Sequence, residues 1–240
     1  MREVLVPVFR RKSVIAVVAV LSCVLALPAS AHSVPIDTTI SCPPSTPSAG
    51  FTDLAGLDPT TQTAINCIFA FGISRGVTDT VFNPHGAVTR QEMALFMLRQ
   101  ATAHGLTIPS PLDQGFTDIA GLPLETQNAI NRVAQMGIST GTSETTFSPN
   151  QFVTRWQMAL FLYRLAQQAG VVVTPDPTGE PLTDIGAYSS DIRTAINYLA
   201  NGHIVVGTSP GIFSGDLFVL RWQMALFITR VLAADGITQP

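Results

Sequence analysis

Three arginines of this 240-residue sequence occupy one position of an internal repeat, at the start of a predicted helix: Arg90, Arg155 and Arg221. The helix dipole disfavours a cation in the first turn by about 0.3–1 kcal/mol. A threefold recurrence therefore indicates that something offsets this cost. Backbone N–H groups at a helix start attract anions, and a guanidinium adds a planar pair of donors that matches a carboxylate. The chemistry that these residues could perform is the binding of an anion, once in each copy.

The alternative is that the arginines are structural. Each could pair with a carboxylate of a neighbouring copy, and one aspartate recurs in every copy: Asp53, Asp118 and Asp184. Because Asp is favoured at helix caps and in turns, these aspartates are expected to cap a helix or to brace a loop. The residues alone leave the anion site and the ion pair as equal alternatives for the arginines.

The residues beside the arginines bear on both interpretations. Thr89 and Thr154 precede two of the arginines, and Glu92 or Gln157 follows three positions later, which is the pattern of a capping box. Trp156 directly follows Arg155, and Trp222 directly follows Arg221. These indoles could stack on a sugar ring or lie buried between copies.

A second arginine series lies nine residues further along each helix: Arg99, Arg164 and Arg230. Nine steps of about 100° place this series on the opposite side of an ideal helix. The second series is therefore interpreted as structural or solvent-facing. The four histidines fall at different repeat positions, so no metal site is predicted, and no catalytic constellation or cofactor motif recurs.

The copies themselves are the clearest feature of the chain. They start at Phe51, Phe116 and Leu182, and the distance from this residue to the arginine is the same in each copy. The predicted boundaries are 51–104, 116–169 and 182–235, joined by connectors rich in Pro, Gly and Thr. Three copies without internal insertions imply one shared backbone.

Each copy is predicted to fold as helix, loop, helix, which makes the chain mainly α. The turn after the first helix contains Gly76 and Gly141, where glycine supplies backbone angles that other residues adopt with strain. Apolar residues at i, i+3, i+4 and i+7 on the second helix predict that its methionines and aromatic residues form the core. A unit of this size buries little surface alone, so the copies should pack on one another and could close around a pseudo-threefold axis.

The N-terminal segment predicts export. A basic start, a 15-residue apolar run and the small-x-small sequence at Ala29–Ala31 are typical of a signal peptide over residues 1–31. A retained membrane anchor is the alternative, although the run is short for a membrane-spanning helix. Residues 32–50 then form a flexible arm, and no membrane contact is expected after cleavage.

Removal of residues 1–31 leaves nine arginines, no lysine and fifteen acidic residues. This net negative charge excludes a general attraction to nucleic acid. Cys42 and Cys67 remain, an even number that suits a disulfide in an oxidising compartment, with two buried thiols as the alternative.

The ordered motifs resemble the S-layer homology repeat: Phe-x-Asp at the start, a Gly-Ile-x-x-Gly turn, Phe-x-Pro, and Thr-Arg opening a hydrophobic helix. The resemblance runs from Phe51 to about Asp235. It implies a three-pronged helical pseudo-trimer that binds secondary cell wall polysaccharide, often pyruvylated, without covalent bonds. It also implies that the arginine of the Thr-Arg motif contacts the acidic sugar.

On this resemblance the candidate polysaccharide-binding residues are Arg90, Arg155, Arg221, Thr89, Thr154, Trp156, Trp222, Gly76 and Gly141. The third copy departs from the pattern, because Leu220 replaces the threonine cap and His203 replaces a glycine. Its site is therefore expected to be degenerate. The predicted function is non-catalytic attachment to the bacterial cell wall at the cell surface. The alternative is an envelope protein-interaction or self-assembly module, with self-association.

Overall fold

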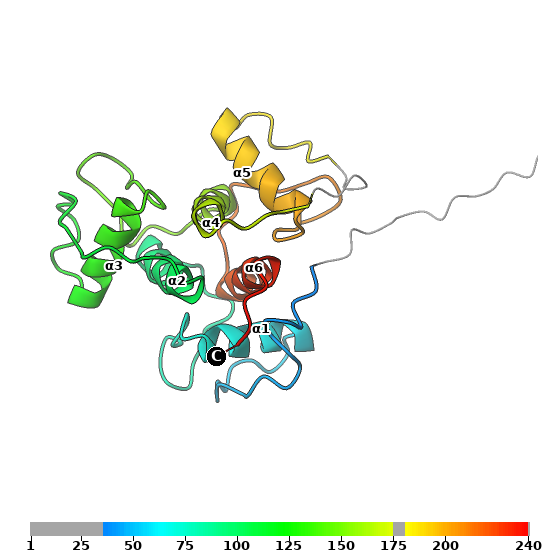
Figure 1. Cartoon of the computed structure of the whole chain (residues 1–240). Helices are drawn as coiled ribbons and strands as arrows, with labels where there is room; N and C mark the ends of the chain where they lie inside the picture. Colours follow the sequence, from blue (N-terminus) through cyan, green and yellow to red (C-terminus); the bar gives the residue numbers. More distant parts are fainter. Residues whose placement is uncertain (1–35, 175–180, 240) are drawn as a thin grey trace, which may run out of the picture. The chain divides into compact units, whose positions relative to one another are not determined.

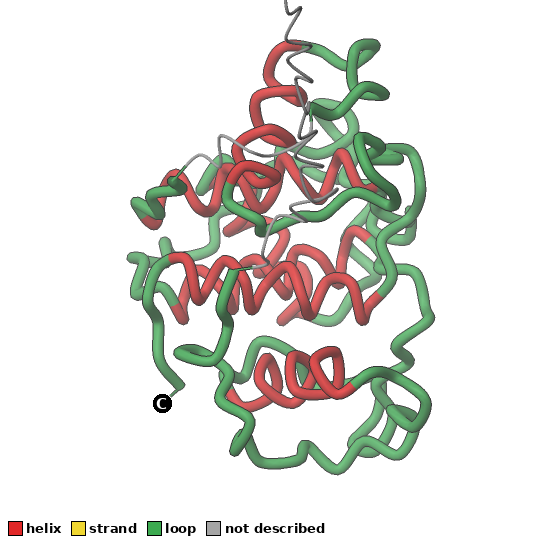
Figure 2. The backbone as a smooth tube through the Cα atoms, turned by 90° about the vertical axis from the view of Figure 1, so that its right-hand side faces the viewer, coloured by secondary structure: helices red, strands yellow, loops and turns green. Residues whose placement is uncertain are grey.

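The computed structural model describes residues 36–174 and 181–239, all of which lie in the unit from His32 to Pro240. The predicted signal peptide and part of the second connector lie outside these residues. The described part contains six helices and no strand (Figures 1 and 2), which confirms the mainly α prediction: α1 Pro59–Ala70, α2 Arg90–Ala103, α3 Leu124–Gln135, α4 Arg155–Ala169, α5 Ser190–Asn201 and α6 Arg221–Ala234. None of the described helices has the length and apolar character needed to span a membrane.

The second helix of each copy begins at the repeated arginine, and two of the three have a capping box. Glu92 Oε2 accepts from the backbone N–H of Thr89 at 2.8 Å, while the Thr89 hydroxyl accepts from the N–H of Glu92. Thr154 and Gln157 form the same reciprocal pair at the start of α4. Both predicted caps are confirmed. A leucine side chain cannot accept a hydrogen bond, so at the start of α6 only the Gln223 half of the box remains.

The first helix of each copy stops at a residue with left-handed backbone geometry. Gly72 and Gly137 both have φ 66°, which glycine adopts without steric cost. His203 takes the same position in the third copy with φ 53°. A residue with a Cβ is strained there by about 1–2 kcal/mol, so the third copy keeps the shape of the turn in spite of its sequence.

The helices pack in a cycle that joins each copy to the next. The second helix of one copy contacts the first helix of the following copy, which pairs α2 with α3 and α4 with α5. The cycle closes because α6 packs on α1. Figure 1 shows α2, α4 and α6 gathered at the centre, with α1, α3 and α5 outside them. The cyclic order is the one that a pseudo-trimer requires, and the pseudo-trimer itself stays a prediction.

Three buried valines close the cycle through their backbones. The N–H of Val88 donates to the carbonyl of Val219, that of Val219 to Val153, and that of Val153 back to Val88, each at 2.9 Å. All three side chains have 0% exposure. We call this set the valine ring. It contains one residue from each copy, and each residue immediately precedes the cap of a second helix.

The core follows from the apolar faces of the second helices. Met158, Leu162 and Leu165 of α4 are fully buried, and Phe161 is nearly so. Equivalent methionines and phenylalanines of α2 and α6 are buried as well. The prediction that these methionines and aromatic residues form the core is confirmed.

The described part of the N-terminal arm is tied to the first copy and to the C-terminal tail. Cys42 and Cys67 form a disulfide with an S–S distance of 2.02 Å. The Ala49 N–H donates to Asn66 at 3.0 Å, and the Ser41 hydroxyl donates to the carbonyl of Ile237. The arm is thus held against α1 and against the residues that follow α6.

Replacing both cysteines by serine is expected to destabilise the protein by about 3 kcal/mol. The disulfide spans 25 residues, and a loop of this length restricts the unfolded chain by roughly that amount. Chemical denaturation of the oxidised wild type and of the double variant measures the difference. An unchanged unfolding midpoint would show that the disulfide contributes nothing to stability.

Candidate functional site: the junctions between copies

Each second helix begins against a loop of the next copy, and we call these contacts the first, second and third junctions. The first joins the start of α2 to residues 147–151, the second joins α4 to residues 213–217, and the third joins α6 to residues 82–86. The loops carry the Phe-x-Pro motif or its variant. All nine candidate polysaccharide-binding residues lie at the junctions or in the turns of the same copies.

The first junction uses three loop carbonyls at alternate positions. Arg90 Nε donates to the carbonyl of Phe147 at 2.7 Å. The backbone N–H groups of Arg90 and Gln91 donate to the carbonyls of Gln151 and Pro149, at 2.9 and 3.0 Å. One loop therefore satisfies the arginine side chain and the first two N–H groups of the helix together.

The other two junctions repeat this arrangement. Arg155 Nε donates to Phe213 at 2.9 Å and Arg221 Nε to Phe82 at 2.7 Å. The N–H groups of both arginines and of the tryptophans after them donate to further loop carbonyls. The expectation that free N–H groups at these helix starts attract an anion is therefore wrong for the first two positions, because protein carbonyls already occupy them.

The three arginines are buried, with exposed fractions of 3%, 2% and 4% for Arg90, Arg155 and Arg221. Each guanidinium carbon lies over a phenylalanine ring of the loop, at 4.7 Å from the centroid of Phe147 in the first junction and 4.8 Å in the others. Cation–π contact and charge-assisted hydrogen bonds stabilise a guanidinium. These contacts are what offsets the unfavourable helix dipole.

The recurring aspartates brace the same loops from the other side. Asp118 accepts from the N–H groups of Phe147 and Ser148, at 2.9 and 2.7 Å. Asp53 and Asp184 do the same in their own copies. Loop bracing is therefore confirmed. Among the described residues no ion pair joins these aspartates to the arginines, so that proposed pairing is wrong.

The junctions differ in how the arginine charge is compensated. Arg221 Nη1 forms an ion pair with Glu92 Oε1 at 2.8 Å. In the described part of the chain Arg90 and Arg155 have no ion pair, since the residues equivalent to Glu92 are Gln157 and Gln223. Burial lowers the pKa of Arg90, and only the more distant charge of Asp118 opposes it. The first and second junctions therefore hold a positive charge that no carboxylate of residues 36–174 and 181–239 contacts.

The first junction also has an unused donor. Arg90 Nη2 is buried and has no hydrogen-bond partner among the residues that the structure describes, whereas Arg155 Nη2 donates to the carbonyl of Val206 at 2.7 Å. An unsatisfied buried donor costs about 1–3 kcal/mol, and more when it is charged. The first junction is consequently the one that an added acceptor would stabilise most.

Aromatic side chains lie beside the second junction. Trp156 is half-buried and its ring lies 6.3 Å from that of Tyr188. The Tyr188 hydroxyl donates to Asp216 at 3.0 Å, and burial together with this carboxylate raises the pKa of Tyr188 to about 12. Sequence reasoning missed Tyr188, because tyrosine occurs at this repeat position only in the third copy. Trp222 at the third junction is also half-buried.

Gly76 and Gly141 have a packing reason for being glycine. Both have φ 77°, and a Cβ would lie 2.5 Å from Phe51 or 2.7 Å from Phe116, the first residue of the same copy. A side chain is excluded by both conditions. The two glycines keep the turn against the start of the copy, and a polysaccharide contact by them stays a prediction.

The model of the S-layer homology domain matches residues 50–94 and 115–159. Each match contains the start of a copy, its first helix, its Phe-x-Pro loop and the beginning of its second helix. No curated protein was found to match the chain. Domains of this kind are in general anchoring domains of the bacterial cell wall. Two segments of the chain are thus similar to the S-layer homology domain, with Arg90 and Arg155 at the same position in each.

Proposed function

We propose that the chain attaches to the cell wall without catalysis, by binding an acidic secondary cell wall polysaccharide at the first and second junctions. The observation that carries this proposal is the difference in charge compensation. Arg90 and Arg155 have no carboxylate partner among the described residues, whereas Glu92 neutralises Arg221. The third junction lacks this uncompensated charge, because Arg221 already forms an ion pair with Glu92.

The ligand group that suits these junctions is a carboxylate. A guanidinium in a buried, low-dielectric position gains more from an opposite charge than an exposed one does. A pyruvyl ketal on a sugar of the polysaccharide supplies such a carboxylate. Each hydrogen bond to a charged group contributes about 1.5–3 kcal/mol, so two modest sites on one polymer could retain the protein through avidity.

The remaining candidate residues support this arrangement. Thr89 and Thr154 hold the helix starts that carry the two arginines. Trp156 and Tyr188 offer half-buried rings beside the second junction, against which one face of a sugar could pack. Trp222 stands in the equivalent place at the third junction. Export by residues 1–31 would place the protein at the cell surface, where this polymer is found.

Sedimentation with purified cell walls tests the proposal. The protein should sediment with intact walls, remain in solution when the secondary polysaccharide has been stripped, and bind weakly to walls from which pyruvate has been removed. Equal sedimentation with intact and stripped walls would overturn polysaccharide binding. Equal binding to pyruvylated and depyruvylated walls would show that the polysaccharide is the ligand but that its pyruvyl group is not recognised.

An assembly module is the second candidate, and an exposed aromatic pair favours it. The rings of Phe152 and Phe218 lie 5.4 Å apart, with 47% and 52% of each residue exposed. Leu217 beside them is 57% exposed. Exposed apolar residues in contact are typical of protein–protein interfaces. Concentration-dependent oligomers in sedimentation velocity, without affinity for isolated polysaccharide, would select this function.

A further inference from the structure

The second arginine series braces the turn that follows each first helix. Arg99, Arg164 and Arg230 donate through Nη1 to the carbonyls of Ile73, Ile138 and Ile204, at 3.2, 3.3 and 3.3 Å. The structural role predicted for this series is therefore confirmed. Each of these arginines also lies on the helix that packs against the first helix of the next copy.

One position of the neighbouring first helix differs between the copies. Glu125 of α3 pairs with Arg99 across the α2–α3 contact, with Nη2 and Oε1 2.8 Å apart. The equivalent residue is Asp191 in α5 and Thr60 in α1. Arg230 of α6 packs against α1. At this repeat position α1 has the hydroxyl of Thr60, whereas α3 and α5 each have a carboxylate.

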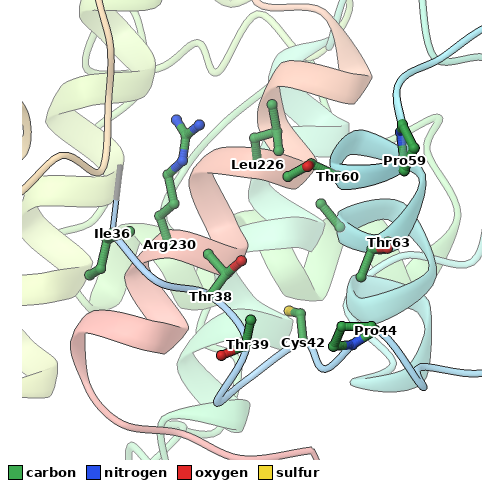
Figure 3. Close-up of a pocket in the computed structure, with 11 residues that line it drawn as sticks. Ile36, Thr38, Thr39, Cys42, Pro44, Pro59, Thr60, Thr63, Leu226 and Arg230 are labelled. Carbon is green, nitrogen blue, oxygen red and sulfur yellow. The ribbon is translucent and has the colours of Figure 1, made fainter. Parts of the chain in front are cut away.

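A pocket of about 280 Å³ lies at this contact. It is lined by Arg230 and Leu226 of α6, by Thr60 and Thr63 of α1, and by Thr38 and Thr39 of the arm. In Figure 3 the Arg230 guanidinium lies toward the same end of the pocket as Leu226 and Thr60, and Cys42 and Pro44 lie toward the other end. Four threonines and one arginine thus line one space.

Arg230 has no carboxylate partner in the described part of the chain, and its one hydrogen bond there is to Ile204. Burial lowers the pKa of Arg230. Arg99, by contrast, has Glu125 beside it. The pocket thus lies at the contact in which the first helix, α1, has no carboxylate at the repeat position of Glu125.

We propose that this pocket binds a carboxylate-bearing small ligand, with Arg230 as the charge partner and the threonine hydroxyls as hydrogen-bond donors. The ligand carboxylate takes the place that a glutamate side chain has in the α2–α3 contact. A volume of about 280 Å³ is near the lower end of ligand pockets and suits one sugar residue or a small organic acid. The site is separate from the three junctions and does not depend on the wall-binding proposal.

Titration with soluble probes, followed by ¹H–¹⁵N NMR, tests the pocket directly. Glucuronate should shift the Arg230 Nε–Hε signal and the amide signals of Thr60 and Thr63, while glucose at the same concentration leaves them in place. Pyruvate is the third probe. A shift with both acids assigns the site to carboxylates in general, and a shift with glucuronate alone assigns it to acidic sugars. No shift with either acid, or an equal shift with glucose, would overturn the proposal.

Two variants and a matched control separate binding from folding. Arg230→Gln should weaken glucuronate binding about tenfold or more, because a hydrogen bond to a charged group contributes at least that factor. Thr60→Glu should abolish binding and keep or raise the melting temperature, since it rebuilds the pair seen between Arg99 and Glu125. Arg164→Gln alters the equivalent arginine of the second copy and should leave binding unchanged. Wild-type affinity in Thr60→Glu, or an equal loss in Arg164→Gln, would reject the site.

Discussion

A protein with Gln157→Glu and Gln223→Glu is expected to lose retention on intact cell walls by tenfold or more while remaining folded. Glu92 shows what a carboxylate does at this position, because it neutralises Arg221 at 2.8 Å. Gln157 and Gln223 occupy the equivalent positions beside Arg90 and Arg155. The new carboxylates would compete with the sugar carboxylate for both arginines. Wall sedimentation measures retention, and thermal unfolding measures stability.

The reverse substitution is the control for this experiment. Glu92→Gln removes the carboxylate that neutralises Arg221, so it should leave retention unchanged or increase it by opening the third junction. Melting temperature should stay equal or rise in the double variant, since two buried charges gain a partner. Full retention by the folded double variant would show that the polymer does not bind at these arginines.

Alanine substitution of the arginines is the less informative experiment. Removal of Arg90 leaves the carbonyl of Phe147 without its side-chain donor and opens a space beneath the aromatic ring. An unsatisfied buried acceptor costs about 1–3 kcal/mol. A loss of wall binding in Arg90→Ala would therefore combine a loss of charge with a loss of structure, whereas glutamine-to-glutamate changes are nearly isosteric.

Deletion of the third copy, leaving a chain that ends at Val173, is expected to abolish cooperative folding of the remaining residues. The deletion removes α6, against which α1 packs. It also removes Phe213, whose carbonyl accepts from Arg155, and opens the valine ring at Val219. Circular dichroism and dispersion of amide NMR signals measure the outcome.

Complementation distinguishes a lost interface from a damaged chain. A separate chain of residues 181–239, added to the truncated protein, should restore the helical signal in a concentration-dependent manner because every missing contact is non-covalent. A truncated protein that unfolds cooperatively on its own would contradict the cyclic dependence of the copies. That result would also make the third copy dispensable for the fold.

The helices and much of the core could be predicted because their signals are local. Helix starts follow from the Thr89 and Thr154 capping boxes, and the buried face follows from the spacing of residues such as Met158 and Phe161. These features depend on residues at most a few positions apart. They recur in three copies, which makes each one visible without reference to any other protein.

The partners of the arginines could not be predicted, because they depend on which copy follows which around the cycle. Arg221 meets Phe82 and Glu92 at the other end of the chain, more than a hundred residues away. The sequence suggested the recurring aspartates as partners, and these instead hold the loops that the arginines contact. The Arg230 pocket is likewise formed by segments that are adjacent only after the cycle has closed.

The valine ring bears on how many copies such a chain must keep. Its three hydrogen bonds run in one rotational direction, so each copy supplies a single donor and a single acceptor that must meet at the centre. Losing one copy leaves one N–H and one C=O unmatched in a region that water does not enter. The number of copies is therefore set by backbone geometry, independently of the number of sites that bind ligand. A third copy with Leu220 and His203 could therefore lack binding chemistry and still be needed to close the ring.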